Sequence, residues 1–157
     1  MSDTQKEITH FLLRYSDLLL NVDTLAEHKS IVADKGHVWM GKFGQGASKR
    51  IVSKAQSQLR EGRQTYLYLA NGKGLNTRAT IVDIVGGGAQ ASYKAPEPDC
   101  VPDYYRSRRC AIWFKLINFE DIEHSHIRQL RLANSPATIP TFNGMRALVY
   151  VFDREKD

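Results

Sequence analysis

The sequence contains few cysteines, few prolines and no long hydrophobic run. Its two cysteines, Cys100 and Cys110, do not form a CxxC pair, so they predict no zinc site. The most apolar stretch, residues 11–20, is interrupted by Arg14 and Asp17, and this excludes a membrane-spanning helix. The first ten residues lack the basic start and apolar run of a signal peptide. We therefore expect a cytoplasmic protein with reduced cysteines.

The length and composition are those of one globular domain. The chain has 157 residues, and domains commonly have about 150. Hydrophobic residues make up 42% and charged residues 25%, which excludes a disordered tail, a collagen and a coiled coil. A chain of this length buries roughly two thirds of its unfolded surface, so it has no need of a disulfide or a metal in order to fold.

The positive charge is concentrated in one part of the chain. The whole sequence has 22 basic and 17 acidic residues and a net charge of +5. The stretch 42–63 alone contains six basic residues and one acidic residue, so its net charge equals that of the entire chain. This stretch is interpreted either as the solvated face of a helix or as a surface that binds a polyanion, and composition does not decide between the two.

Hydrophobic periodicity predicts three helices. Apolar residues at spacings of three and four predict an amphipathic helix over 5–20 and a second helix over 23–34. A third helix is expected over 49–61, where Ser48 supplies a side chain that can cap its N-terminus. A short helix or turn is expected over 120–133.

After residue 36 the pattern changes to short runs of β-branched and aromatic residues. These runs predict five strands, over 37–43, 64–70, 77–85, 110–119 and 145–152. The order of elements favours an α+β fold, with a small curved five-stranded sheet or open β-barrel and two N-terminal helices. We therefore expect an N-terminal helical segment over 1–36 and a sheet domain over 37–157.

Five short segments of this sheet domain carry a family resemblance. They are HVWMG at 37–41, EGR at 61–63, TYLY at 65–68, RATIVD at 78–83 and AIWFKL at 111–116. Their order resembles that of the PUA-like superfamily, within it the EVE and ASCH-type domains. The resemblance covers about residues 37–153 and leaves residues 1–36 outside it.

The resemblance implies a binding module and not an enzyme. Members of this class hold a single nucleobase, often a modified one, in an aromatic-lined pocket between the sheet and its loops. Some belong to modification-dependent restriction proteins, and others act on RNA. A flipped base needs aromatic faces on which to stack and a few polar groups for its edge. Stacking contributes about 1–3 kcal/mol per base, and lysines and arginines add a salt-sensitive contribution that is independent of sequence.

Three parts of the chain offer the residues that such binding requires. Residues 41–50 join a strand to a helix N-terminus through a glycine-rich stretch, an arrangement that favours a phosphate. Residues 104–109 mix tyrosines, which stack, with arginines, which pair with phosphates. Trp39 and Tyr68 are aromatic candidates within strands. The candidate nucleic-acid- and base-binding residues are Trp39, Lys42, Phe43, Gln45, Ser48, Lys49, Arg50, Tyr68, Tyr104, Tyr105 and Arg106.

Each of these candidates also has a purely structural interpretation. Residues 41–50 and 104–109 can be ordinary surface loops, and large aromatic residues such as Trp39 and Tyr68 commonly lie in cores. For Trp113, at the centre of its strand, the core is the favoured place.

No arrangement of residues predicts catalysis. His124 and His126 lie close to Glu123 but have no further ligand at a metal-binding spacing. The sequence has no GxSxG and no Walker motif, and Asp83 and Asp103 are isolated carboxylates. We expect no catalytic residues, no metal and no cofactor.

The favoured hypothesis is a nucleic-acid-binding module that reads a possibly modified base of DNA or RNA. A sensor or enzyme for a small nucleotide is the first alternative, and a protein-interaction module is the second. No membrane partner is expected, and the predicted N-terminal helices offer a docking surface for a protein partner.

Overall fold

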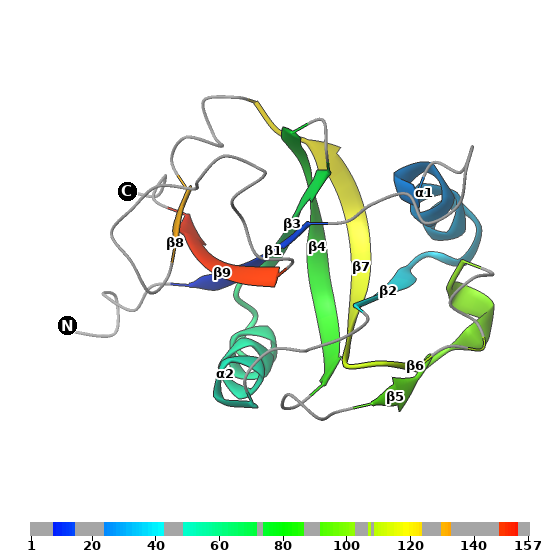
Figure 1. Cartoon of the computed structure of the whole chain (residues 1–157), viewed down its shortest axis with the longest axis horizontal. Coiled ribbons are helices and arrows are strands. Elements are labelled where there is room, and N and C mark those ends of the chain that lie inside the picture. The colour runs from blue at the N-terminus through cyan, green and yellow to red at the C-terminus, as the bar shows by residue number, and fades with distance from the viewer. Residues whose placement is uncertain are drawn as a thin grey trace.

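The computed structural model describes residues 8–14, 24–42, 49–71, 74–86, 92–102, 107, 109–123, 130–132 and 148–153. Figure 1 shows the arrangement of the helices and strands. In chain order the elements are β1 (Thr9–Arg14), α1 (Thr24–Lys35), β2 (Val38–Lys42), α2 (Lys49–Arg60), β3 (Tyr66–Asn71), β4 (Gly74–Gly86), β5 (Tyr93–Lys94), a 3₁₀ turn (Pro98–Cys100), β6 (Arg109–Cys110), β7 (Ile112–Asp121), β8 (Leu130–Leu132) and β9 (Leu148–Asp153).

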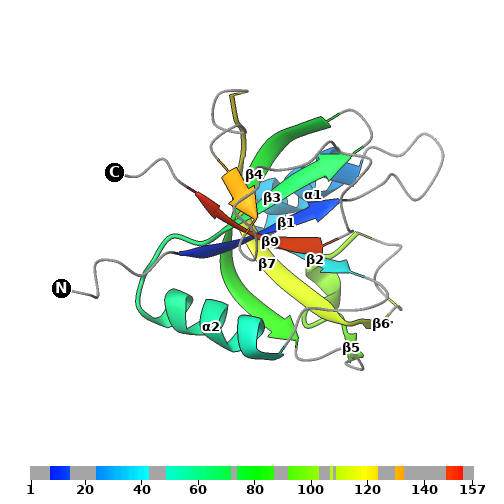
Figure 2. The ribbon, with the colours of Figure 1, turned by 60° about the vertical axis from the view of Figure 1, so that its left-hand side comes forward.

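Seven of the strands form one sheet in the order β2-β7-β4-β3-β1-β9-β8, and β5 pairs with β6 in a separate ribbon. The pair β1–β3 is parallel, and the other pairs are antiparallel. Within the described residues the edge strands β2 and β8 do not pair with each other, so this sheet is not closed into a barrel. The register of the β4–β7 pair shifts twice, and β4 bends visibly along its length (Figure 2).

The main core lies on one face of this sheet. Side chains from β1, β2, β3, β4 and β7 meet there with Val52 and Ala55 of α2. Partly buried side chains of α1, among them Leu25 and Val32, pack against the same core. The two helices lie far from each other in both views, since α1 packs on β2 and β7, and α2 on β1 and β4 (Figures 1 and 2).

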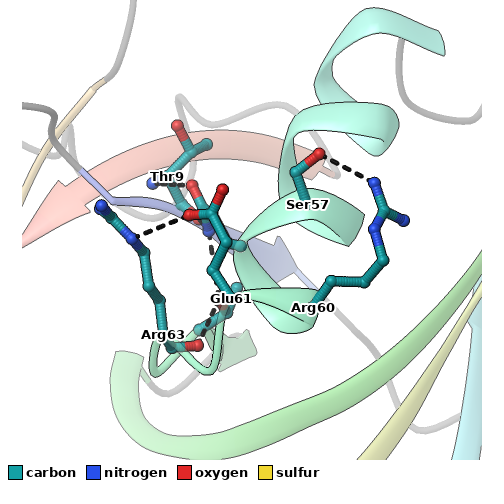
Figure 3. A network of polar contacts seen from close by, with 7 residues as sticks. Thr9, Ser57, Arg60, Glu61 and Arg63 are labelled. Carbon is teal, nitrogen blue, oxygen red and sulfur yellow. Dashed lines mark hydrogen bonds and ion pairs between the residues drawn. The ribbon is translucent and has the colours of Figure 1, made fainter. Parts of the chain in front are cut away.

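A buried glutamine joins α2 to β1. The side-chain oxygen of Gln58 accepts a hydrogen bond from the backbone N–H of Thr9 (2.9 Å), and its amide nitrogen donates to the Thr9 carbonyl (3.0 Å). The same nitrogen donates to the Thr65 hydroxyl at 3.1 Å. Figure 3 shows Thr9 beside the C-terminal half of α2. Thr9 is only 1% exposed, so Gln58 satisfies backbone groups that lie in a buried region.

The predicted helix over 5–20 is wrong, because residues 9–14 form strand β1. This strand lies inside the sheet between β3 and β9 and is buried on both faces: Phe11 and Leu13 contact the main core, and Leu12 on the opposite face is also buried. A strand buried on both faces has a continuous apolar run in place of alternation, and in a short segment such a run is easily mistaken for a helix.

Within the described residues, one helix, α1, lies before β2, and not the two N-terminal helices that we expected. Residues 5–7 and 15–20 of the predicted helix lie outside the described residues. The expected boundary at residue 36 separates β1 from β2, although both belong to the same sheet.

The other predicted elements are largely confirmed. Helices α1 and α2 match the predictions over 23–34 and 49–61, and the five predicted strands correspond to β2, β3, β4, β7 and β9. The expectation of a five-stranded sheet is wrong, because β1 and β8 also belong to it. The expected helix or turn over 120–133 is wrong at both ends: β7 continues to Asp121, and residues 130–132 form β8.

Both helices have 12 residues. In the described part of the chain, neither is long and apolar enough to cross a membrane.

Candidate nucleic-acid interface

Helix α2 separates apolar and basic residues onto different faces. Val52 and Ala55 are buried against the main core. The outward face carries exposed cations, which are Lys49, Arg50, Lys54 and Arg60. This separation makes the helix strongly amphipathic and leaves a basic face exposed to solvent.

The acidic residue of the stretch 42–63 lies outside helix α2. Glu61 follows the helix, and its carboxylate pairs with the Arg63 guanidinium at 3.1 Å (Figure 3). The first turn of α2 has no acidic residue, whereas Lys49 and Arg50 are both there. Cations are unfavourable at the positive end of a helix dipole, and a bound anion would relieve this repulsion.

Lys42 lies at the end of β2, directly before the stretch that leads to α2. It is half-buried, and burial lowers the pKa of its ammonium group while the nearby Cys110 opposes the shift. The backbone carbonyl of Lys42 accepts a hydrogen bond from Ala111 at 3.1 Å, which fixes the end of the strand. Lys42 and the pair Lys49 and Arg50 thus mark the two ends of residues 43–48, which lie outside the described residues.

Trp39 is buried on the face of β2 opposite to the main core. It is 3% exposed and belongs to a second apolar cluster with Trp113, Ala95, Cys100 and Val101. Three members of this cluster come from residues 92–102, a segment that covers the indole ring. A base reaches this ring only after the segment is displaced.

A carboxylate holds the indole of Trp39 in place. The indole N–H donates to the carboxylate of Glu97 at 2.6 Å, and His37 forms a hydrogen bond with the same oxygen at 2.7 Å. These hydrogen bonds, the one from Trp39 first, lower the pKa of Glu97. The Cys100 thiol lies nearby, and burial raises its pKa.

Trp113 is fully buried in the same cluster, so its expected core position is confirmed. Its indole N–H donates to the Tyr93 carbonyl at 3.0 Å, which fixes the start of the covering segment. Gly41 lies opposite Trp113 in the β2–β7 pair. A methyl group at Gly41 would lie 2.9 Å from the Trp113 ring and 2.6 Å from the Cys110 sulfur.

Gly41→Ala is therefore expected to destabilise the protein. The added carbon overlaps a buried indole and a buried thiol that have no room to move apart, and overpacking of this kind costs about 1–3 kcal/mol. Urea unfolding of the variant beside the parent measures the change. Gly36→Ala serves as a control without steric overlap, because nothing lies within 4 Å of a methyl group there and its cost is limited to backbone strain at φ +93°. Unchanged stability of Gly41→Ala would contradict this close packing.

Tyr68 lies in a third cluster, on β3. It is fully buried, and its ring lies 5.9 Å from His10 and 6.1 Å from Tyr66. The Arg78 guanidinium stacks over the Tyr66 ring at 3.9 Å and pairs with Glu120 at 2.6 Å. Although burial opposes it, the hydrogen bonds to Glu120 and Tyr68 raise the pKa of Arg78. Arg78 therefore stays charged, and the carboxylate of Glu120 balances its charge.

The structure does not bring Trp39 and Tyr68 together. Both lie on the face away from the main core, but β2 and β3 are three positions apart in the sheet, which corresponds to about 14 Å. Lys49 and Arg50 lie together on α2. The remaining candidates lie outside the described residues; they are Phe43, Gln45, Ser48, Tyr104, Tyr105 and Arg106.

A hollow of about 430 Å³ lies between α1 and the end of the covering segment. Among the described residues, its lining includes the carboxylates of Glu27, Asp34 and Asp99, and Lys35 is the single cation there. This excess of negative charge disfavours a phosphate, so the two sides of the molecule differ: α2 suits a polyanion, and the hollow beside α1 does not.

Sequence reasoning missed the polar residues that hold these clusters together, chiefly Glu97, His37 and Arg78. Glu97 bonds to a residue 58 positions earlier in the chain, and Arg78 pairs with one 42 positions later. No local spacing signals such pairs. The one available signal is the need of a buried indole N–H for an acceptor.

In the described residues, a mixed α+β sheet carries two packed helices, and the outward face of α2 is basic. The family description Pua-like matches the chain over residues 11–148. The chain therefore belongs to the Pua-like family, and the match includes residues 11–14 of β1, which the resemblance seen in the sequence had left out. No curated protein matches the chain.

Proposed function

We propose that this protein is a nucleic-acid-binding module that contacts the phosphate backbone with the outward face of α2. The observation that carries the proposal is the set of four exposed cations on this helix, two of them in a first turn without an acidic residue. Phosphate contacts by lysine and arginine dominate the affinity of most nucleic-acid-binding proteins.

Residues 43–48 are proposed to belong to the same surface. They join Lys42 to Lys49 in the sequence, and a glycine-rich stretch of this kind favours contact between backbone N–H groups and a phosphate. The bound strand would then follow α2 and not α1, whose neighbouring hollow is acidic. This difference in charge would orient the protein on a nucleic acid, with α2 toward the phosphates and the acidic hollow away from them.

The finer part of the proposal is that the module resembles EVE and ASCH-type domains and reads one base, possibly modified. This part rests on the sequence resemblance and on the tyrosines and arginines at 104–109, which are residue types suited to stacking on bases and to pairing with phosphates. In DNA the base would have to leave the duplex, so a modified or mismatched base is the favoured target.

The test is binding of short fluorescent oligonucleotides measured by polarisation. The panel contains DNA and RNA, single- and double-stranded, plain and with methylated bases, at about 50 and 200 mM salt. We expect salt-sensitive binding, with one type of oligonucleotide preferred. No binding at low salt contradicts the proposal and points to a protein partner.

The charge-neutralised variant Lys49→Gln/Arg50→Gln localises the interface. Each phosphate contact to duplex DNA contributes about 0.9 to the slope of log affinity against log salt, so the slope should flatten by about 1.8. The matched control is Lys29→Gln/Lys35→Gln, which removes the same charge from exposed positions of α1. Equal effects of the two variants would mean that only net charge matters, and would remove α2 from the interface.

The proposal is for binding without turnover. Incubation with free nucleotides, followed by chromatography, checks this point. Formation of a product would support instead a small-nucleotide enzyme.

A further inference from the structure

The geometry points to a divalent-metal site, for Zn²⁺ or a chemically similar ion, formed by His37, Glu97 and Cys100. The imidazole nitrogen, a carboxylate oxygen and the thiol sulfur of these residues all lie within 4.8 Å of one another. Imidazole, carboxylate and thiolate are the three side-chain ligands that zinc accepts, at about 2.0–2.3 Å. This inference is independent of the proposed nucleic-acid binding.

Two of the ligands lie on one rigid turn. Glu97 and Cys100 are three positions apart, and the Cys100 N–H donates to the Glu97 carbonyl at 2.8 Å. The 3₁₀ turn between them begins with Pro98, which restricts the backbone further. The spacing of two intervening residues is that of the CxxC pairs in zinc knuckles, with a carboxylate in place of the first thiolate.

The third ligand comes from the residue directly before strand β2. His37 precedes β2, and its Nε2 already lies 2.7 Å from the Glu97 oxygen. Ligands of a tetrahedral ion lie about 3.3 Å or more from each other, so this pair must open by a fraction of an ångström. The side chains of His37 and Glu97 are 22% and 44% exposed, which gives them freedom to move and gives an ion a way in.

A residue next to the site forms a hydrogen bond that would orient one of the metal ligands. The Trp39 indole donates to the same Glu97 oxygen at 2.6 Å, and Trp39 is itself fixed in the buried cluster. Hydrogen bonds of this kind orient metal-binding carboxylates. The ammonium groups of Lys35 and Lys115 act on Cys100 and would repel a bound cation. The carboxylate of Asp99 also acts on Cys100 and would attract one.

Three protein ligands leave the fourth tetrahedral position to water. Such an ion would tie the turn at residues 97–100 to the start of β2, and would hold the covering segment 92–102 over Trp39. The predicted consequence is a metal-dependent fixation of this segment.

The test is a titration of the chelator-treated protein with Co²⁺, whose thiolate complexes absorb in the near ultraviolet. We expect one ion per chain, a thiolate absorption band, displacement by Zn²⁺ and a higher Tm with Zn²⁺ than without. Cys100→Ser should abolish the band, whereas Cys110→Ser, which removes the other buried thiol, should retain it.

Two further variants keep the test decisive if Cys100→Ser fails to fold. His37→Gln and Glu97→Gln change partly exposed side chains, and each should weaken Co²⁺ binding by more than the roughly 10–100-fold that loss of an outer-shell hydrogen bond typically causes. Trp39→Phe should produce only that smaller loss. Absence of one-to-one binding, or binding that neither glutamine variant weakens, overturns the inference.

Discussion

Replacing Gln58 with alanine should destabilise the protein by about 2–5 kcal/mol, one of the two largest effects that we expect. The change leaves the N–H and the carbonyl of Thr9 without their partners in a region closed to water. Each such buried group costs about 1–3 kcal/mol, because its hydrogen bonds to water are not restored. Urea unfolding followed by circular dichroism measures the loss.

Gln56→Ala is the matched control on the same helix. Gln56 is half-buried and donates one hydrogen bond, to the Ile84 carbonyl at 2.9 Å. Its replacement should cost about 1 kcal/mol, the net contribution of an ordinary hydrogen bond. If both variants lose the same free energy of unfolding, the hydrogen bonds between Gln58 and Thr9 contribute no more to stability than one ordinary hydrogen bond.

The Gln58 variant also connects stability with the proposed interface. Gln58 fixes the C-terminal half of α2 to β1, while the cations at 49, 50 and 54 lie nearer the N-terminal half. A loosened helix end should therefore lower stability and change the salt slope of nucleic-acid binding by at most the one contact of Arg60, about 0.9. A larger change of the slope would indicate that the helix no longer holds its other cations in position.

The fold was predictable where local patterns have one meaning. Helix α2 shows a clear apolar stripe, and β4 is rich in β-branched residues, so both were predicted nearly at their observed bounds. Strand β1 was not, because a strand buried on both faces shows no alternation. Strand β8 has only three residues, too few for any periodicity.

The candidate site was predictable in its charges and not in its contacts. The exposure of Lys49 and Arg50 follows from the opposite, apolar face of α2, which the sequence displays. The carboxylate that holds Trp39 comes from Glu97, across 58 residues of chain, and depends on how residues 92–102 fold back over the sheet. Trp39 is an aromatic candidate for base stacking in the sequence, but Gly41, two residues later, makes room for the buried ring of Trp113.

Trp39→Ala is expected to cost about 3–5 kcal/mol, the range for large buried aromatic residues. The ring is 3% exposed and contacts the covering segment, so its removal leaves a cavity between that segment and β2. Trp39→Phe keeps most of the volume and loses the bond to Glu97, whose exposed carboxylate can bind water instead. It should therefore cost only about 1 kcal/mol.

Tyr93→Ala is the control. Tyr93 is an aromatic residue of the covering segment 92–102, and it is 37% exposed. Its replacement should change stability by less than about 1 kcal/mol. The opposite pattern would be informative: if Trp39→Ala kept full stability but lost the preference for one oligonucleotide, the covering segment would have to open in solution and expose the indole to a base. Thermal unfolding and oligonucleotide binding, measured on the same three variants, separate a packing role of Trp39 from a base-contacting one.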